Sequence, residues 1–168
     1  MVTRTSSTST GAPRKGGAAI IGADRNVSNG PGPEVMDADT LIGDSVVNSA
    51  GEDLGEVKAI MLDVESGRIA YAVLSFGGFL GMGNKLFAIP WSAFTLDAGE
   101  KRFVLDIEKD RLDNAPGFDK DHWPAMADAS WATKLHEYYG VKPYWDDSLP
   151  PQDPRTSSGA AMREPGSY

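Results

Sequence analysis

The chain has 168 residues and a formal net charge of −8, because 24 Asp and Glu residues outnumber 16 Lys and Arg residues. This length is enough for one domain with tails, and an acidic chain repels phosphate backbones, which argues against broad nucleic-acid binding. The absence of cysteine excludes disulfide frameworks, zinc–thiolate sites and thiol nucleophiles.

Both ends of the chain have the composition of disordered tails. Residues 1–36 and 148–168 are rich in Ser, Thr, Gly and Pro and contain few large apolar side chains. Such segments cannot bury enough surface to offset the entropy lost on ordering. The sequence also has no apolar run as long as a signal peptide or a membrane span requires. We therefore expect an ordered region at about 37–147 in a cytoplasmic protein.

Short apolar segments separated by turn residues occupy residues 37–112 and predict a small barrel. The first strand is expected to contain Leu41, Ile42, Val46 and Val47. The following strands are expected at residues 56–64, 68–76, 85–90, 93–96 and 102–107. The predicted fold is all-β: a six-stranded antiparallel barrel with a C-terminal helical arm.

The predicted strand at residues 68–76 is apolar on both faces. Tyr71 and Val73 point to one face, and Ala70, Ala72 and Leu74 point to the other. A strand of this kind is normally covered on both sides, whereas a barrel interior covers only one. Another part of the chain must therefore lie against the outside.

Residues 113–147 offer that cover as a loop followed by a helix. The segment from Pro124 to Tyr139 predicts a helix that stops at Gly140. His136 is expected on its polar side. The apolar face is expected to consist of Trp131, Leu135, Tyr138 and Tyr139.

The residues from about Thr40 to Leu112 resemble the PRC-barrel domain, which occurs in the H subunit of the photosynthetic reaction centre and in a ribosome maturation factor. The resemblance is carried by Leu41-Ile42-Gly43, by the run from Gly67 to Val73, and by the glycine-rich loop at residues 77–85 that leads into Ala88-Ile89-Pro90-Trp91. It implies a PRC-barrel domain at residues 37–112, similar to the stand-alone bacterial members of the family. The family implies an adaptor or interaction module rather than an enzyme.

Four residues are candidates for contact with a partner: Phe79, Leu80 and Met82 in the glycine-rich loop, and Trp91 at a strand end. Large apolar side chains are unusual at a solvated loop tip, which favours a protein contact. A phosphate cradle is disfavoured because the loop leads into a strand instead of a helix.

No catalytic, cofactor-binding or metal site is predicted. The sequence has two histidines, His122 and His136, and it lacks a Gly-x-Ser-x-Gly elbow. The carboxylates of Asp106, Glu108 and Asp110 have the spacing of a solvated face.

The sequence thus favours a non-catalytic interaction module that forms a homodimer, without a cofactor. Two alternatives remain open at this point. One is an RNA- or ribosome-associated factor, and the other is a small-molecule carrier or enzyme that uses the barrel mouth.

Overall fold

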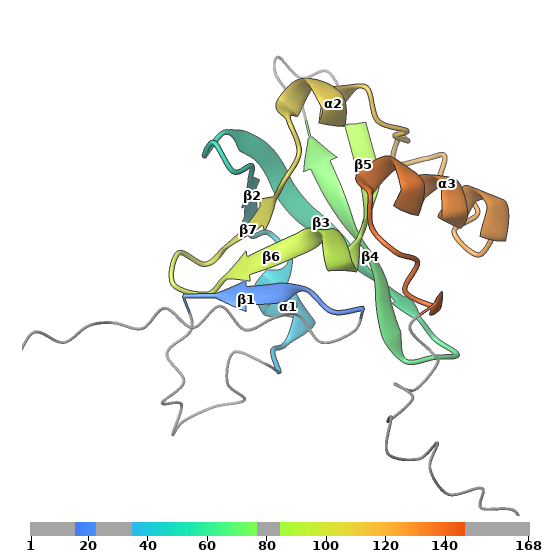
Figure 1. Ribbon diagram of the computed structural model, residues 1–168, viewed down its shortest axis with the longest axis horizontal. Helices are drawn as coiled ribbons and strands as arrows, with labels where there is room; N and C mark the ends of the chain where they lie inside the picture. The colour runs from blue at the N-terminus through green and yellow to red at the C-terminus, as the bar shows by residue number, and fades with distance from the viewer. Residues whose placement is uncertain (1–15, 23–34, 77–84, 147–168) are drawn as a thin grey trace, which may run out of the picture.

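The structure is a computed structural model that describes residues 16–22, 35–76 and 85–146 (Figure 1). Within these ranges, seven strands form one curled sheet in the order β1-β6-β7-β2-β3-β4-β5. The strands are β1 Ala19–Ile21, β2 Ser45–Val47, β3 Asp53–Asp63, β4 Arg68–Phe76, β5 Lys85–Pro90, β6 Phe94–Asp97 and β7 Arg102–Leu105. The helices are α1 Ala38–Leu41, the 3-10 turn η2 Trp91–Ala93, α2 Lys109–Asp113 and α3 Ala129–Tyr139.

The prediction of six antiparallel strands is wrong for the described part of the chain. An additional strand, β1, pairs with β6 in parallel, and β2 also pairs with β7 in parallel. Parallel partners need long connections, so no local turn signal in the sequence reveals them. The sheet is open, with β1 and β5 at its edges.

Two further expectations need correction near the N-terminus. Ala19–Ile21 form β1, although residues 1–36 were expected to lack regular structure. Leu41 ends the short helix α1 instead of starting a strand, because the side chain of Asp37 accepts a hydrogen bond from the N–H of Asp39 at 3.0 Å and caps the turn. The C-terminal tail expected at residues 148–168 lies outside the described residues.

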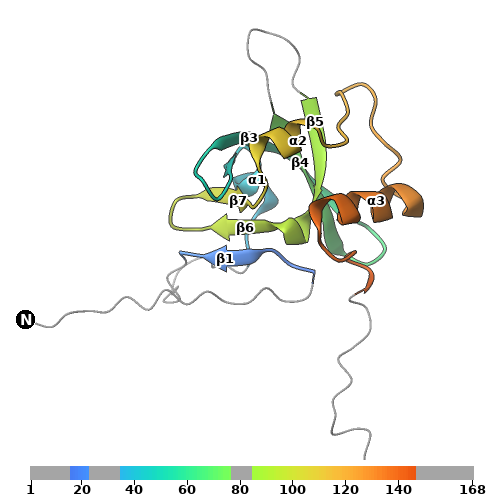
Figure 2. The ribbon, with the colours of Figure 1, turned by 45° about the horizontal axis from the view of Figure 1, so that its top comes forward.

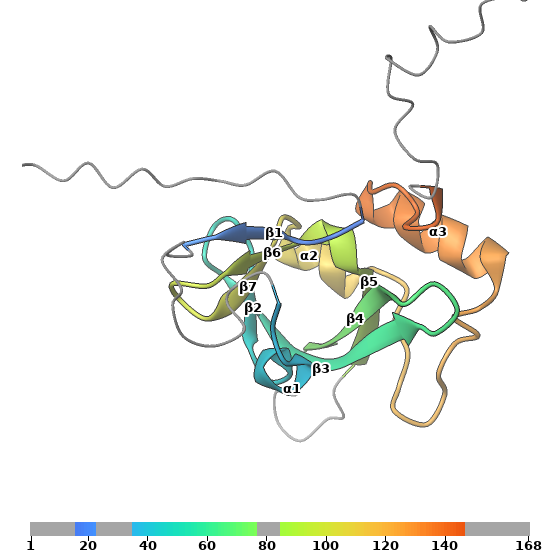
Figure 3. The same ribbon diagram turned by 90° about the horizontal axis from the view of Figure 1, so that it is seen from below.

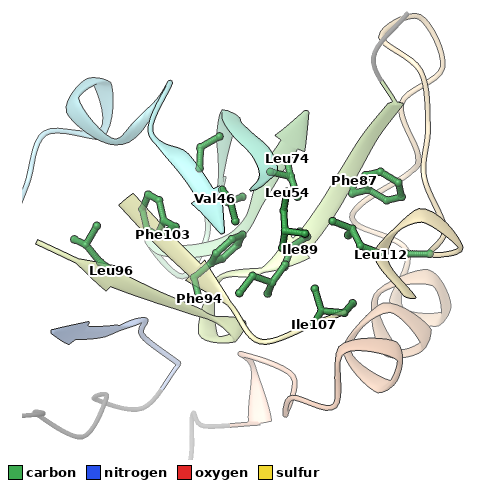
Figure 4. Packing of buried hydrophobic residues seen from close by; sticks show 14 of the residues in the cluster. Val46, Leu54, Leu74, Phe87, Ile89, Phe94, Leu96, Phe103, Ile107 and Leu112 are labelled. Carbon is green, nitrogen blue, oxygen red and sulfur yellow. The ribbon is translucent and has the colours of Figure 1, made fainter. Parts of the chain in front are cut away.

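The main core fills the concave side of the sheet (Figure 4). Side chains from β2 to β7 meet there with those that follow β7. The largest contributions to this core come from Val46, Leu54, Leu74, Phe87, Ile89, Phe94, Phe103 and Leu112, each at most 1% exposed.

Strand β4 is buried on both faces, from Ala70 to Ser75. Ala72 and Leu74 belong to the main core, whereas Tyr71 faces a second cluster on the outside of the sheet. Ala70 was expected to point to the same face as Ala72 and Leu74, but the pairing with β3 shifts register beside it, so Ala70 joins the outer cluster instead.

The free edge of strand β5 is covered by the segment that follows α2. Leu86 and Phe118 exchange two backbone hydrogen bonds of 2.8 Å each. Leu86 therefore points its backbone groups away from β4, and by alternation Pro90 does the same. The missing N–H of Pro90 leaves no gap in the β4–β5 ladder.

The surroundings of Gly55 leave no room for a side chain. Its φ is +117°, and an added Cβ would lie 2.0 Å from the carbonyl oxygen of Ser75. We predict that Gly55→Ala destabilises the fold by about 2–4 kcal/mol, because it combines a disfavoured φ with a backbone clash. Urea unfolding followed by circular dichroism measures this change.

Gly51 provides the matched control. Its φ is +80°, but an added Cβ would meet no atom within 4 Å. Gly51→Ala should therefore cost only the conformational penalty, about 1–2 kcal/mol. Equal costs for the two substitutions would contradict the steric argument.

Candidate interaction surface

Helix α3 has defined caps at both ends and lies beside β4 and β5 (Figures 1 and 3). The side chain of Asp128 accepts a hydrogen bond from the N–H of Trp131 at 2.8 Å. Gly140 adopts the left-handed conformation, with φ 68°, that ends the helix. The cap at Asp128 makes the helix begin at Ala129, later than the predicted start at Pro124.

The buried residues of α3 are Ala132, Leu135 and His136, and Trp131, Tyr138 and Tyr139 are half-buried against the two clusters. Leu135 contacts the outer cluster that contains Tyr71 and Ala88. His136 is only 1% exposed, so its predicted place on the polar side is wrong. The packed face therefore contains the four predicted residues and extends to Ala132 and His136.

Aromatic rings fill the space between α3, β4 and the segment after the helix. The ring centroid of Tyr71 lies 5.5 Å from that of Trp131 and 6.2 Å from that of Tyr144, both with edge-on geometry. His136 lies 5.7 Å from Tyr71 and 5.1 Å from Trp145. Such edge-on ring pairs add stabilisation beyond the area that they bury.

The segment after α3 is fastened to the β3–β4 hairpin. The guanidinium of Arg68 donates a hydrogen bond to the carbonyl oxygen of Tyr144 at 2.6 Å. The pKa of Tyr144 is raised, mainly by burial and also because its hydroxyl hydrogen-bonds to Asp63. These contacts hold residues 141–146 against the hairpin, over one edge of the aromatic cluster.

The imidazole of His136 is held as a neutral ring. Its Nδ1 lies 2.7 Å from the carbonyl oxygen of Ala132, which can only accept, so Nδ1 carries the proton. Its Nε2 and the hydroxyl of Tyr71 are buried without a hydrogen-bond partner among the described residues. Burial lowers the pKa of His136, while the bond to Ala132 opposes this shift.

The end of the β3–β4 hairpin exposes large apolar side chains, and Leu62 points to the opposite face from its neighbour Met61, which packs in the outer cluster. Val64 is 85% exposed and Leu62 is 57% exposed. Leu62 is the cross-strand partner of Ile69, which is half-buried, so these two side chains lie on one side of the hairpin. We refer to Leu62, Val64 and Ile69 as the hairpin tip.

The residues predicted to contact a partner are distributed differently. Phe79, Leu80 and Met82 lie outside the described residues. Trp91 is half-buried in η2, where its ring lies 5.7 Å from Phe103. The hairpin tip was not predicted as a contact site from the sequence, although Leu62 and Val64 directly precede the turn signal at residues 65–67 and Ile69 follows it.

A cleft of about 1160 Å³ lies on a different side of the domain, between the β2–β3 turn, the end of β7 and the end of α3. The carboxylates of Asp106, Glu108 and Asp110 line it and are exposed, as expected for a solvated face. Arg111 and Tyr138 close one side, because each donates a side-chain hydrogen bond to the carbonyl oxygen of the other. Among the described residues, no group of three or more His, Asp or Glu side chains could hold a metal ion.

Comparison with protein families identifies the class of domain. Residues 33–112 match the family model of the PRC-barrel domain, so the chain carries a PRC-barrel domain and the expected family is confirmed. The curated proteins give no match to this chain. In the part of the chain that the structure describes, no helix is long and apolar enough to cross a membrane.

The packing of α3 yields a stability prediction. Leu135→Ala should destabilise the protein by about 2–4 kcal/mol, since it leaves a cavity against Tyr71 and Ala88. Lys134→Ala is the matched control, because Lys134 is exposed on the same helix and its loss should change stability by no more than about 0.5 kcal/mol. Thermal unfolding of both variants tests this, and equal midpoints would show that α3 contributes little.

The buried imidazole yields a pH prediction. His136 has a folded pKa below its ordinary 6.5, so the unfolded chain binds more protons as the pH falls through that value. Stability should therefore decrease between about pH 7 and about pH 5. The pKa values of Asp63 and Asp119 are also lowered, chiefly by a hydrogen bond from the Ser66 N–H and by one from the His122 ring respectively, so their contributions disappear only as the pH falls below about 3.8.

Urea unfolding at several pH values separates these effects. His136→Phe keeps a ring in the cluster and should remove the decrease between pH 7 and pH 5. His122→Asn is the control, because His122 is exposed and the decrease should persist without it. A wild-type stability that does not change over this interval would contradict the argument.

Proposed function

We propose that this protein is a non-catalytic, cytoplasmic interaction module that associates with a second copy of itself through the hairpin tip. The observation that supports this most directly is the exposure of Leu62 and Val64, at 57% and 85%, at the end of the β3–β4 hairpin. Clustered exposed apolar side chains commonly mark interaction sites. A two-fold dimer is the commonest way for identical chains to cover such a surface.

The packing of the hairpin supports the same proposal. Helix α3 covers the outer face around Tyr71 and Ala88, whereas Leu62 at the end of the hairpin lies on the other face, which α3 does not cover. Two hairpin tips related by a two-fold axis would place the Leu62 side chains of the two copies together. A stable dimer buries roughly 800 Å² per partner, so neighbouring parts of the hairpin would take part as well.

The two alternatives have weaker support. The net charge of −8 disfavours an RNA-binding role, since phosphate backbones are repelled. A carrier or enzyme role would place its ligand in a pocket with convergent polar groups. The cleft beside α2 instead carries exposed carboxylates and a side closed by the Arg111–Tyr138 pair.

Sedimentation equilibrium at micromolar concentration tests the proposal. We expect the wild-type chain to sediment as a dimer and the double variant Leu62→Glu, Val64→Glu to dissociate at least tenfold more readily. Ile42→Glu is the matched control, because Ile42 is 40% exposed at the end of α1 and its substitution should leave the dimer intact. A wild-type monomer, or a double variant that remains dimeric, would contradict the proposal.

A further inference from the structure

Strand β1 occupies the free edge of β6 as a short parallel strand (Figure 2). Its register pairs Ala19 with Thr95 and Ile21 with Asp97. Ile20 points toward the main core and packs against it. The strand thus behaves as an extended ligand seated on a sheet edge, held by backbone pairing and one inserted apolar side chain.

The end of β1 imposes a sequence requirement. The carbonyl oxygen of Ile21 accepts a hydrogen bond from the N–H of Ala98 at 2.9 Å, and Gly22 then turns away with φ +68°. A Cβ at Gly22 would lie 2.9 Å from the side chain of Asp97 and 2.9 Å from the backbone nitrogen of Gly99. The edge therefore accepts a segment that carries an apolar side chain followed two positions later by glycine.

The attachment of β1 is slight compared with that of the other strands. It has three residues, all of them only half-buried, and it pairs on one side only. Short, partly exposed edge elements are the first to open in native proteins. Once β1 leaves, the backbone groups of β6 that faced it lose their partners, and an incoming strand restores them.

We propose that the β6 edge is a strand-acceptor site for an extended segment of a partner protein with the pattern apolar-x-Gly, and that β1 is its built-in competitor. The chemistry of the partner is defined by β1 itself, because Ile20 and Gly22 show which side chains the edge accepts. Covalent attachment gives β1 the advantage of an intramolecular ligand, so the partner segment binds when β1 is released. This site is separate from the hairpin tip and does not depend on the proposed dimer.

The test uses the full-length chain and a fluorescent peptide that copies residues 15–25. Ile20→Asp in the protein removes the inserted side chain and should release β1, so that the peptide binds this variant at least tenfold more tightly than it binds wild type. A peptide with Gly22→Val should bind the same variant at least tenfold more weakly. The Ile42→Asp protein retains Ile20 and should bind the peptide no better than wild type.

Several results would overturn the proposal. One is equal binding to wild type and to the Ile20→Asp chain, and another is no binding by an Ile20→Asp chain whose circular dichroism is unchanged. If that variant does not fold, the Gly22→Val protein releases β1 by a different route and is judged in the same way. A wild-type dimer that Ile20→Asp dissociates, while the Leu62→Glu, Val64→Glu variant stays dimeric, would show that the occupant is a second copy and not a partner protein.

Discussion

The burial of β4 on both faces is the constraint on which the rest of the structure depends. Ala72 and Leu74 on one side help to form the main core, and Tyr71 on the other side would be exposed on a bare sheet. Exposing an apolar strand face to water is costly, at about 25 cal/mol for each Å² of apolar surface. The chain meets this constraint by returning after the last strand and laying α3 over Tyr71 and Ala88.

This cover determines where the domain can interact. Helix α3 is fixed through Leu135, and the segment after it is fixed by the hydrogen bond from Arg68 to Tyr144. Leu62 points to the opposite face of the hairpin from Met61 and Tyr71, and it remains exposed together with Val64. His136 lies within the cover as a neutral ring, which links the attachment of the arm to protonation. Packing and acid sensitivity thus have a common origin on the outer face.

Much of this arrangement could be predicted from local pattern, and the remainder depended on distant contacts. The strand at Arg68–Phe76 was predicted from its apolar run, with the bounds that the structure gives. Strand β1 could not be predicted, because Ala19–Ile21 is apolar for only a few residues and is stabilised by β6, far away in the sequence. The burial of His136 was accessible in principle: Ala132, Leu135 and Tyr139 have helical spacing, and His136 lies within that stripe. The prediction gave more weight to the large rings of Trp131 and Tyr138, and it therefore placed His136 on the polar side of the helix.

The two edges of the sheet differ in how firmly they are closed. At β5, Leu86 and Phe118 exchange two backbone hydrogen bonds, Pro90 offers no N–H, and α3 packs beside the strand. At β6, the closing element is a three-residue strand that is half-buried and has no further strand beyond it. Unpaired strand edges recruit other strands, so the less firmly closed edge is where strand addition needs the smallest rearrangement. The hairpin tip instead offers exposed apolar side chains, so the two surfaces suit different kinds of contact and can be occupied independently.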